Sequence, residues 1–136
     1  MSRWLQAKLS TLSNIETHFF NDALERLGYK ADFSNKKLMR PEGDYQEVDC
    51  VVVEKNSGKS IGVGLRFHAE QDGNVSMTVV ADWFYSSLTS KGFTEKFTIE
   101  YNTVKYIAAA ESMNFAVESV ENMADGRRRI VVARAA

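Results

Sequence analysis

The stretch Val75–Tyr85, VSMTVVADWFY, decides the predicted fold. Its odd positions are all apolar, while Ser76, Thr78 and Asp82 fall on the even positions. Successive side chains of a strand point to opposite faces of a sheet, so this alternation predicts a strand with one buried face. We therefore expect this strand near the middle of a sheet, with a polar face opposite the core.

Two further strands are predicted before this stretch. Val48–Glu54 is a short apolar run, and Ile61–His68 alternates apolar residues with polar residues or glycine. Asn56–Gly58 separates these two runs, and Asp72–Asn74 separates the second run from Val75. Asparagine and glycine tolerate the positive φ that tight turns demand. The pattern predicts an antiparallel meander of three strands.

A first strand and a first helix are predicted ahead of the meander. Arg3–Ser10 shows a loose alternation of apolar residues, which indicates a strand. Ser13 and Glu16 form a capping-box pattern, in which each side chain accepts a hydrogen bond from an amide at the helix start. Apolar residues then recur at helical spacing over Ile15–Leu27. Gly28 follows, where a left-handed residue commonly ends a helix.

A second helix and a final hairpin are predicted after the meander. The helix, with Ser90 or Thr94 as its cap, is indicated by an apolar stripe at i, i+4, i+8, i+11 and i+15. The runs Phe115–Val120 and Arg129–Ala133 bracket Asp125-Gly126, a pair typical of a type I′ turn. The stripe consists of Phe93, Phe97, Tyr101, Val104 and Ala108.

These elements, with a short edge strand at Phe33–Met39, follow one another in the order β-α-β-β-β-β-α-β-β. Single helices that separate groups of antiparallel strands favour the α+β class over the alternating α/β class. We predict an antiparallel sheet of about six or seven strands with both helices on one face. A chain of 136 residues is long enough to bury one core, so residues 1–136 are expected to form a single domain.

Charge and cysteine content restrict the expected partners. The 17 Lys and Arg residues nearly balance the 18 Asp and Glu residues, which does not favour binding to nucleic acid or to a membrane surface. The single Cys50 has no disulfide partner within the chain, which is typical of a reducing compartment. No apolar run approaches the roughly 20 residues that cross a bilayer. We expect a cytoplasmic protein without a cofactor.

Several short motifs occur together in the order known from one protein family. They are Met1-Ser2-x-Trp4, Leu27-Gly28, Ile61-Gly62, Val80-Ala81-Asp82, the long helix with Tyr101, Phe115-Ala116-Val117-Glu118, Asp125-Gly126 and Ile130-Val131-Val132. The chain resembles the proteins of the hypothetical chloroplast reading frame thirty-five, carried by algal plastids and cyanobacteria, with wider bacterial relatives. The resemblance covers nearly the whole chain and implies a fold, but it implies no activity, since that of the family is unknown.

The chain departs from this family at two residue positions and matches it poorly over Tyr29–Glu47. Asn114 precedes Phe115 where the family has glycine, and Arg134 is followed by two alanines where the family ends in arginine and an aromatic residue. These departures indicate a divergent bacterial or phage-borne relative.

Candidate binding residues lie on the polar face of the predicted sheet. Arg66 and His68 share a strand face, and Asp82 lies on the same side of the sheet. Asp82 either accepts hydrogen bonds within the fold, pairs with Arg66 or contacts a ligand. An Asp–His pair suits general acid–base chemistry, yet no motif supplies a nucleophile beside it, so no catalytic residue is assigned. Tyr101 on the long helix is the fourth ligand-binding candidate.

Basic residues near the C-terminus are candidates for phosphate contacts. Arg127, Arg128 and Arg129 form the longest charge run of the chain. The alternative is a solvated hairpin whose charges prevent edge-to-edge aggregation. Val53–Ser60 ends like a phosphate-binding P-loop but begins with valine where glycine is required, so we interpret it as a hairpin turn. Two histidines and one cysteine give no motif for a metal site, and none is assigned.

Two functions are compatible with these patterns. The first is a non-enzymatic binding or assembly module that presents a sheet face or strand edge to a protein partner, with a homo-oligomer as an open option. The second is a small-molecule binder or enzyme that uses the polar face with Arg66, His68 and Asp82. The absence of a complete catalytic motif favours the first. A deep pocket on the polar face would favour the second.

Overall fold

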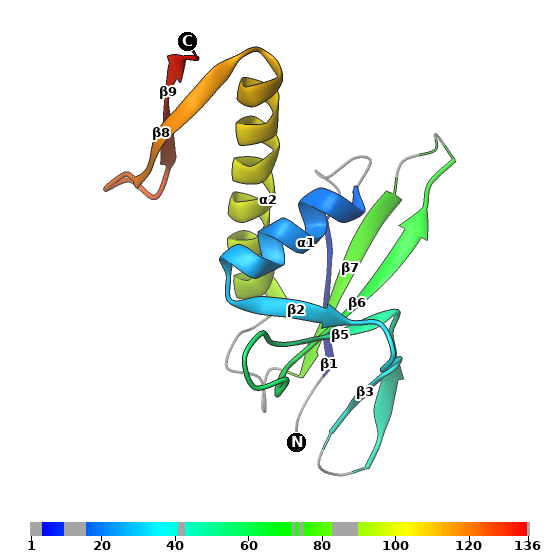
Figure 1. The fold of residues 1–136 in the computed structure, drawn as a ribbon. Coiled ribbons are helices and arrows are strands. Elements are labelled where there is room, and N and C mark those ends of the chain that lie inside the picture. Colours follow the sequence, from blue (N-terminus) through cyan, green and yellow to red (C-terminus); the bar gives the residue numbers. More distant parts are fainter. Residues whose placement is uncertain are drawn as a thin grey trace.

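The computed structural model describes residues 4–9, 16–40, 43–71, 73, 75–82 and 90–135, and nine strands and two helices lie within them (Figure 1). In chain order they are β1 (Trp4–Leu9), α1 (Thr17–Arg26), β2 (Tyr29–Asp32), β3 (Lys37–Met39), β4 (Tyr45–Glu47), β5 (Cys50–Glu54), β6 (Ser60–Ala69), β7 (Val75–Asp82), α2 (Ser90–Ser112), β8 (Phe115–Asn122) and β9 (Arg128–Arg134). The strand pairs among them are antiparallel, which confirms the α+β class.

The predicted meander forms the middle of a five-stranded sheet. The strand order is β1-β7-β6-β5-β2, so β7 lies between β1 and β6. The first strand of the chain, whose alternation predicted a strand, pairs with β7. Both the meander and the first strand are confirmed.

The expected sheet of six or seven strands is wrong in size, because two hairpins form sheets of their own. Within the described residues, β3 pairs with β4 and β8 pairs with β9, and neither hairpin joins the five strands. The 23 residues of α2 make it about 34 Å long. Because β8 follows the far end of this helix, the last hairpin lies well away from the main sheet (Figure 1).

The predicted edge strand Phe33–Met39 is also wrong in its bounds. The chain is already extended over β2, turns after Asp32, and becomes extended again at Lys37. The turn follows from the Asp32 carboxylate, whose Oδ1 accepts a hydrogen bond from the Ser34 amide at 3.0 Å. Such a side-chain bond to the backbone two residues on competes with a continuous strand.

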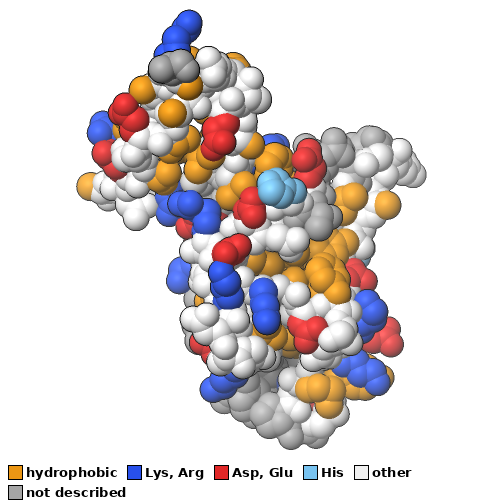
Figure 2. Space-filling view, in the orientation of Figure 1, with side chains coloured by type: hydrophobic (Ala, Val, Ile, Leu, Met, Phe, Trp, Pro, Cys, Tyr) orange, Lys and Arg blue, Asp and Glu red, His pale blue; other side chains and the backbone are white. Residues whose placement is uncertain are grey.

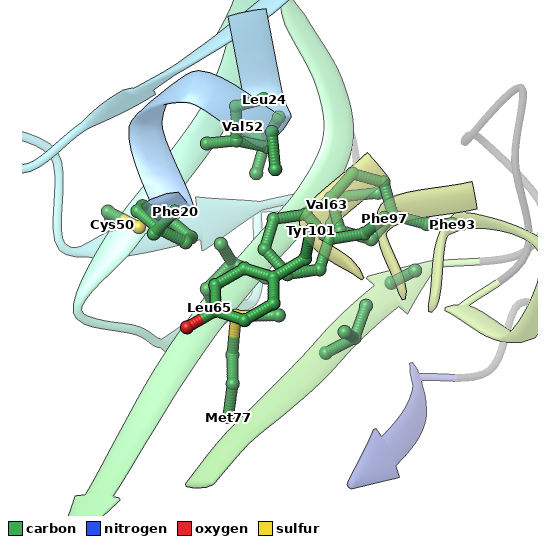
Figure 3. Close-up of a cluster of buried hydrophobic side chains, with 13 residues drawn as sticks. Phe20, Leu24, Cys50, Val52, Val63, Leu65, Met77, Phe93, Phe97 and Tyr101 are labelled. Carbon is green, nitrogen blue, oxygen red and sulfur yellow. The ribbon is translucent and has the colours of Figure 1, made fainter. Parts of the chain in front are cut away.

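Both helices cover the same face of the sheet, as predicted. The side chains that pack there from β6 and β7 are those of the odd positions, which confirms the period-two pattern. Figure 3 shows Phe97 and Tyr101 lying over this face of the sheet, and the two ring centroids are 5.8 Å apart. The buried members of this core are Phe20, Ala23, Leu24, Cys50, Val52, Val63, Leu65, Met77, Val79, Ala81, Phe93, Phe97 and Tyr101.

The start of α1 differs from the expected capping box. The helix begins at Thr17 with Glu16 as its N-cap residue, and the Glu16 side chain makes no capping bond. Ser13 lies outside the described residues. Instead, the Glu16 amide donates a hydrogen bond to the Tyr101 hydroxyl at 3.2 Å, so α2 supplies a partner for an amide at the N-terminus of α1. The end of the helix is as predicted, because Gly28 has a φ of 83°.

The caps and turns of the second half of the chain need two further corrections. Thr94 lies inside α2 and does not cap it, and the Ser90 side chain lies outside the described part. The turn between β8 and β9 is not type I′, since only Gly126 within it has a positive φ. Its ends are joined by a hydrogen bond of 2.7 Å from the Met123 amide to the Arg127 carbonyl.

The face of the sheet opposite the helices is not an open polar surface. A second buried cluster lies there, formed by Leu38, Val48, Val51, Val53 and Val80. The cluster includes Leu38 of β3 and Val48, the residue after β4, so the first hairpin covers part of the even-numbered face.

The closest approach in this second cluster is that of Val48 to Gly64 of β6. A Cβ placed on Gly64 would meet Cγ1 of Val48 at 2.6 Å, which is closer than carbon atoms pack. We expect Gly64→Ala to lower the free energy of unfolding by about 1–3 kcal/mol, as overpacked cores do. In a Val48→Ala background the same change should cost clearly less, and urea unfolding of the four proteins measures this difference. An equal cost in both backgrounds would contradict the close approach.

Candidate functional site

Arg66 and His68 lie in a pocket between β6 and the first hairpin. Its volume is about 490 Å³, and Lys36, Lys37 and Asp49 also line it. Three basic side chains and a histidine therefore surround a hollow of the size that small ligands occupy. The structure thus brings together two of the residues that the sequence singled out.

The polar groups of this pocket are already bonded within the fold. Arg66 donates through Nε to the Glu47 carbonyl at 2.6 Å and through Nη2 to Oε1 of Gln46 at 2.9 Å. His68 Nε2 lies 2.9 Å from Oγ1 of Thr78 on β7. The guanidinium of Arg66 therefore ties β4 to β6, and a ligand would compete with these bonds.

Asp82 does not join this pocket. The register pairs Arg66 with Thr78, so Asp82 lies four residues farther along β7, about 13 Å away. Its backbone pairs with Trp4 at the end of β1, and its side chain lies outside the described part. The expected juxtaposition of Asp82 with Arg66 and His68 is therefore not formed.

Tyr101 lies on the other side of the sheet from Arg66 and His68. Its side chain is fully buried in the core beneath the helices, with the hydroxyl at the start of α1. Burial raises the pKa of this hydroxyl. The four ligand-binding candidates thus lie in three separate places.

The three consecutive arginines each contact a carboxylate of the chain itself. Arg127 donates to Asp125 at 2.7 Å within the turn, and Arg129 donates to Glu121 at 2.9 Å across the hairpin. Arg128 binds Glu100 of α2. Because neighbouring side chains of a strand point to opposite faces, the three guanidinium groups do not converge on a single phosphate.

Glu100 is the polar residue that the sequence analysis missed. It is 9% exposed, and its Oε1 accepts hydrogen bonds from Arg128 of β9 and from Nε of Arg26 of α1, the latter at 2.9 Å. Burial would raise the pKa of Glu100, but its bonds to the two guanidinium groups and their charges outweigh burial, so the pKa lies below 4.5. One signal was available: Glu100 falls within the buried stripe of α2, between Phe97 and Val104.

Replacing Glu100 tests this ion cluster. We expect Glu100→Gln to lower the free energy of unfolding at pH 7 by about 3 kcal/mol, because two arginines lose their buried counter-charge. Glu121→Gln is the matched control, and its loss should be much smaller because the Glu121–Arg129 pair is exposed. Equal losses in urea unfolding of the two variants would contradict a buried cluster.

The same cluster gives a pH dependence with a defined sign. Since the pKa of Glu100 is lowered on folding, its contribution to stability is present above 4.5 and is lost as the pH falls through its folded-state pKa. The difference in stability between wild type and Glu100→Gln should therefore shrink below pH 4.5. Urea unfolding across this range measures it, and a constant difference would exclude a lowered pKa.

Cys50 is fully buried in the core, at the start of β5. Burial, reinforced by the charge of Asp49, raises the pKa of its thiol to about 12. A thiol in this state is a poor nucleophile. We expect labelling of Cys50 by a thiol reagent at pH 8 to be limited by unfolding, with a rate that follows urea concentration as the unfolding rate does. Rapid labelling of the folded chain would contradict this.

A second hollow lies at the far end of α2. We define the C-terminal lobe as residues 106–135, the last turns of α2 with the β8–β9 hairpin. A groove of about 360 Å³ separates the two, lined by Tyr106, Ala109, Ala110, Met113, Arg128, Ile130 and Val132. Figure 2 shows hydrophobic side chains among charged ones on this lobe, at the upper left. Apart from Arg128 and the Tyr106 hydroxyl, the lining side chains are apolar.

Large exposed apolar side chains line this groove. Tyr106 is 68% exposed, Met113 is 65% exposed and Val132 is 39% exposed. Neither described helix combines the length and apolar character that crossing a membrane requires. Exposed apolar groups that gather beside a groove are typical of an interaction surface.

A family described as "Protein of unknown function (DUF1257)" matches residues 23–131. The match begins within α1 and ends within β9, so it includes the pocket around Arg66, the Glu100 cluster and most of the lobe. No curated protein and no solved structure matches the chain. Because the match spans well over half of the chain, the protein belongs to this family of unknown function.

Proposed function

We propose that the chain is a non-enzymatic binding or assembly module, and that it engages a protein partner through the C-terminal lobe. The observation that carries the proposal is the apolar groove between α2 and β9. The groove lies outside both buried clusters, so its apolar residues are not needed to complete the core. Surface of this kind is stabilised when a partner removes it from water.

The strand beside the groove supports the same proposal. β9 has a single strand neighbour, β8, within the described residues. The outer edge of a two-stranded sheet therefore presents backbone amides and carbonyls that another strand can pair with. An apolar groove and an open strand edge together offer side-chain and backbone contacts to one partner.

The alternative is a small-molecule binder or enzyme that uses Arg66 and His68. Its specific support is the pocket of about 490 Å³, in which the basic side chains of Lys36, Lys37 and Arg66 outnumber the carboxylates of Glu47 and Asp49, which favours an anionic ligand. Against it, Arg66 and His68 already bond to Glu47, Gln46 and Thr78. We therefore place this function second.

We also propose that the chain is a divergent bacterial or phage-borne relative of the proteins of the hypothetical chloroplast reading frame thirty-five, located in the cytoplasm. The order of its short motifs supports the first point, and its single cysteine supports the second. Asn114 stands where the family has glycine, and it keeps a backbone conformation typical of glycine. Its φ is 66°, a value that glycine adopts most easily. Asparagine is the residue that most often replaces glycine at such a position.

A matched pair of tryptophan variants tests the proposed surface. Ala109 lines the groove, and Ala116 is exposed on the face of β8 that points away from it. Immobilised wild type and the two variants are incubated with native lysate, and quantitative mass spectrometry compares the retained proteins. We expect Ala109→Trp to lose, at least about tenfold, a protein that wild type and Ala116→Trp both retain. Equal retention by all three would contradict the lobe as the binding surface.

A further inference from the structure

The partner of the lobe can be specified further, on the basis of the function proposed above. We propose that the lobe binds an extended segment of a different protein, with apolar residues in its centre and an acidic residue beside Arg134. The segment pairs as a third strand with the outer edge of β9. Its side chains on the α2 side enter the groove.

The position of the groove favours strand addition to β9 rather than β8. The hairpin residues that line it are Arg128, Ile130 and Val132, all from β9 and on one face of that strand. A strand added to β9, rather than to β8, would therefore lie beside the strand that lines the groove. The α2 wall there includes Ala109 and Ala110, whose small side chains leave room for those of a segment.

The charges of β9 define the ends of the segment. Arg128 and Arg129 begin the strand, Arg134 ends it, and the four residues between them are apolar. Arg134 contacts the ring of Phe115, with its guanidinium carbon 6.0 Å from the ring centroid. No ion pair with a carboxylate occurs at Arg134 among the described residues. Arg128 and Arg129 already pair with Glu100 and Glu121, so the charge that an added strand meets without a carboxylate partner among the described residues is that of Arg134, which favours an acidic residue beside it.

The same charges disfavour a second copy of the chain as the occupant. Antiparallel pairing of β9 with itself, centred on Val131, sets Arg128 opposite Arg134 of the copy. Moving the register by one residue sets Arg129 opposite Arg134 instead. Like charges directly opposite each other destabilise a strand pair. The edge therefore selects against its own sequence and for an acidic partner.

The test uses labelled peptides and the full chain. The probe is a short peptide with valine and threonine alternating in its centre and glutamates at both ends, and the control peptide carries lysines in place of the glutamates. Fluorescence anisotropy should show that the glutamate peptide binds at least about tenfold more tightly. N-methylation of the central amides should abolish binding, because it removes the donors that pair with β9.

Three variants of the chain locate the binding. Ala109→Trp should lose the glutamate peptide, and Ala116→Trp should keep it. Arg134→Glu should reverse the preference towards the lysine peptide, and circular dichroism melting checks that each variant is folded. Reversal of the preference cannot result from a merely misfolded lobe.

The outcomes separate this inference from the proposed function. Equal binding of the two peptides, or no effect of Ala109→Trp, would overturn the acidic strand segment. A dimer in sedimentation that disappears in Ala109→Trp would also overturn it, because a second copy would then occupy the groove. If the glutamate peptide does not bind, but wild type still captures a protein from lysate that Ala109→Trp loses, only this inference is overturned. Failure of both assays would remove the proposed function as well.

Discussion

The carboxylate of Glu100 joins three elements: α1 through Arg26, β9 through Arg128, and α2 itself. A buried carboxylate is costly unless it is paired, and here two guanidinium groups provide the pairing. Glu100 lies where α2 passes the end of the aromatic stack that covers the sheet. Beyond Tyr101, the residue after Glu100, α2 contributes no residue to the main buried core. Arg128 thus helps to fix the direction in which the last hairpin lies.

The residues that stabilise the main fold differ from those of the surface that we propose for binding. The two helices cover one face of the five-stranded sheet, and the first hairpin covers part of the other face. The pocket around Arg66 remains there, but its polar side chains also hold the hairpin in place. The C-terminal lobe carries exposed apolar groups without such a role. A binding function on the lobe can therefore vary while the core stays intact.

Local patterns of sequence were sufficient for much of the fold. Alternation around Val75 predicted the central strand and its buried face, and the Phe93–Tyr101 spacing predicted the helix that covers it. The size of the sheet could not be predicted, because a hairpin has the same sequence pattern whether it joins a large sheet or forms a two-stranded sheet of its own. The Glu100 cluster was missed because its partners lie 74 and 28 residues away in the chain. The Arg66–Asp82 juxtaposition failed because facing the same side of a sheet does not fix position along it.

Site-specific photo-crosslinking in lysate of the source cells tests the binding role of the lobe most directly. A photoreactive phenylalanine analogue replaces Tyr106 on the lobe or, in a second protein, Tyr45 beside the Arg66 pocket; both tyrosines are exposed. We predict that illumination joins a different protein to the chain from position 106 and not from position 45. Crosslinks confined to position 45, or crosslinks from position 106 that join only two copies of the chain, would contradict a protein-binding lobe.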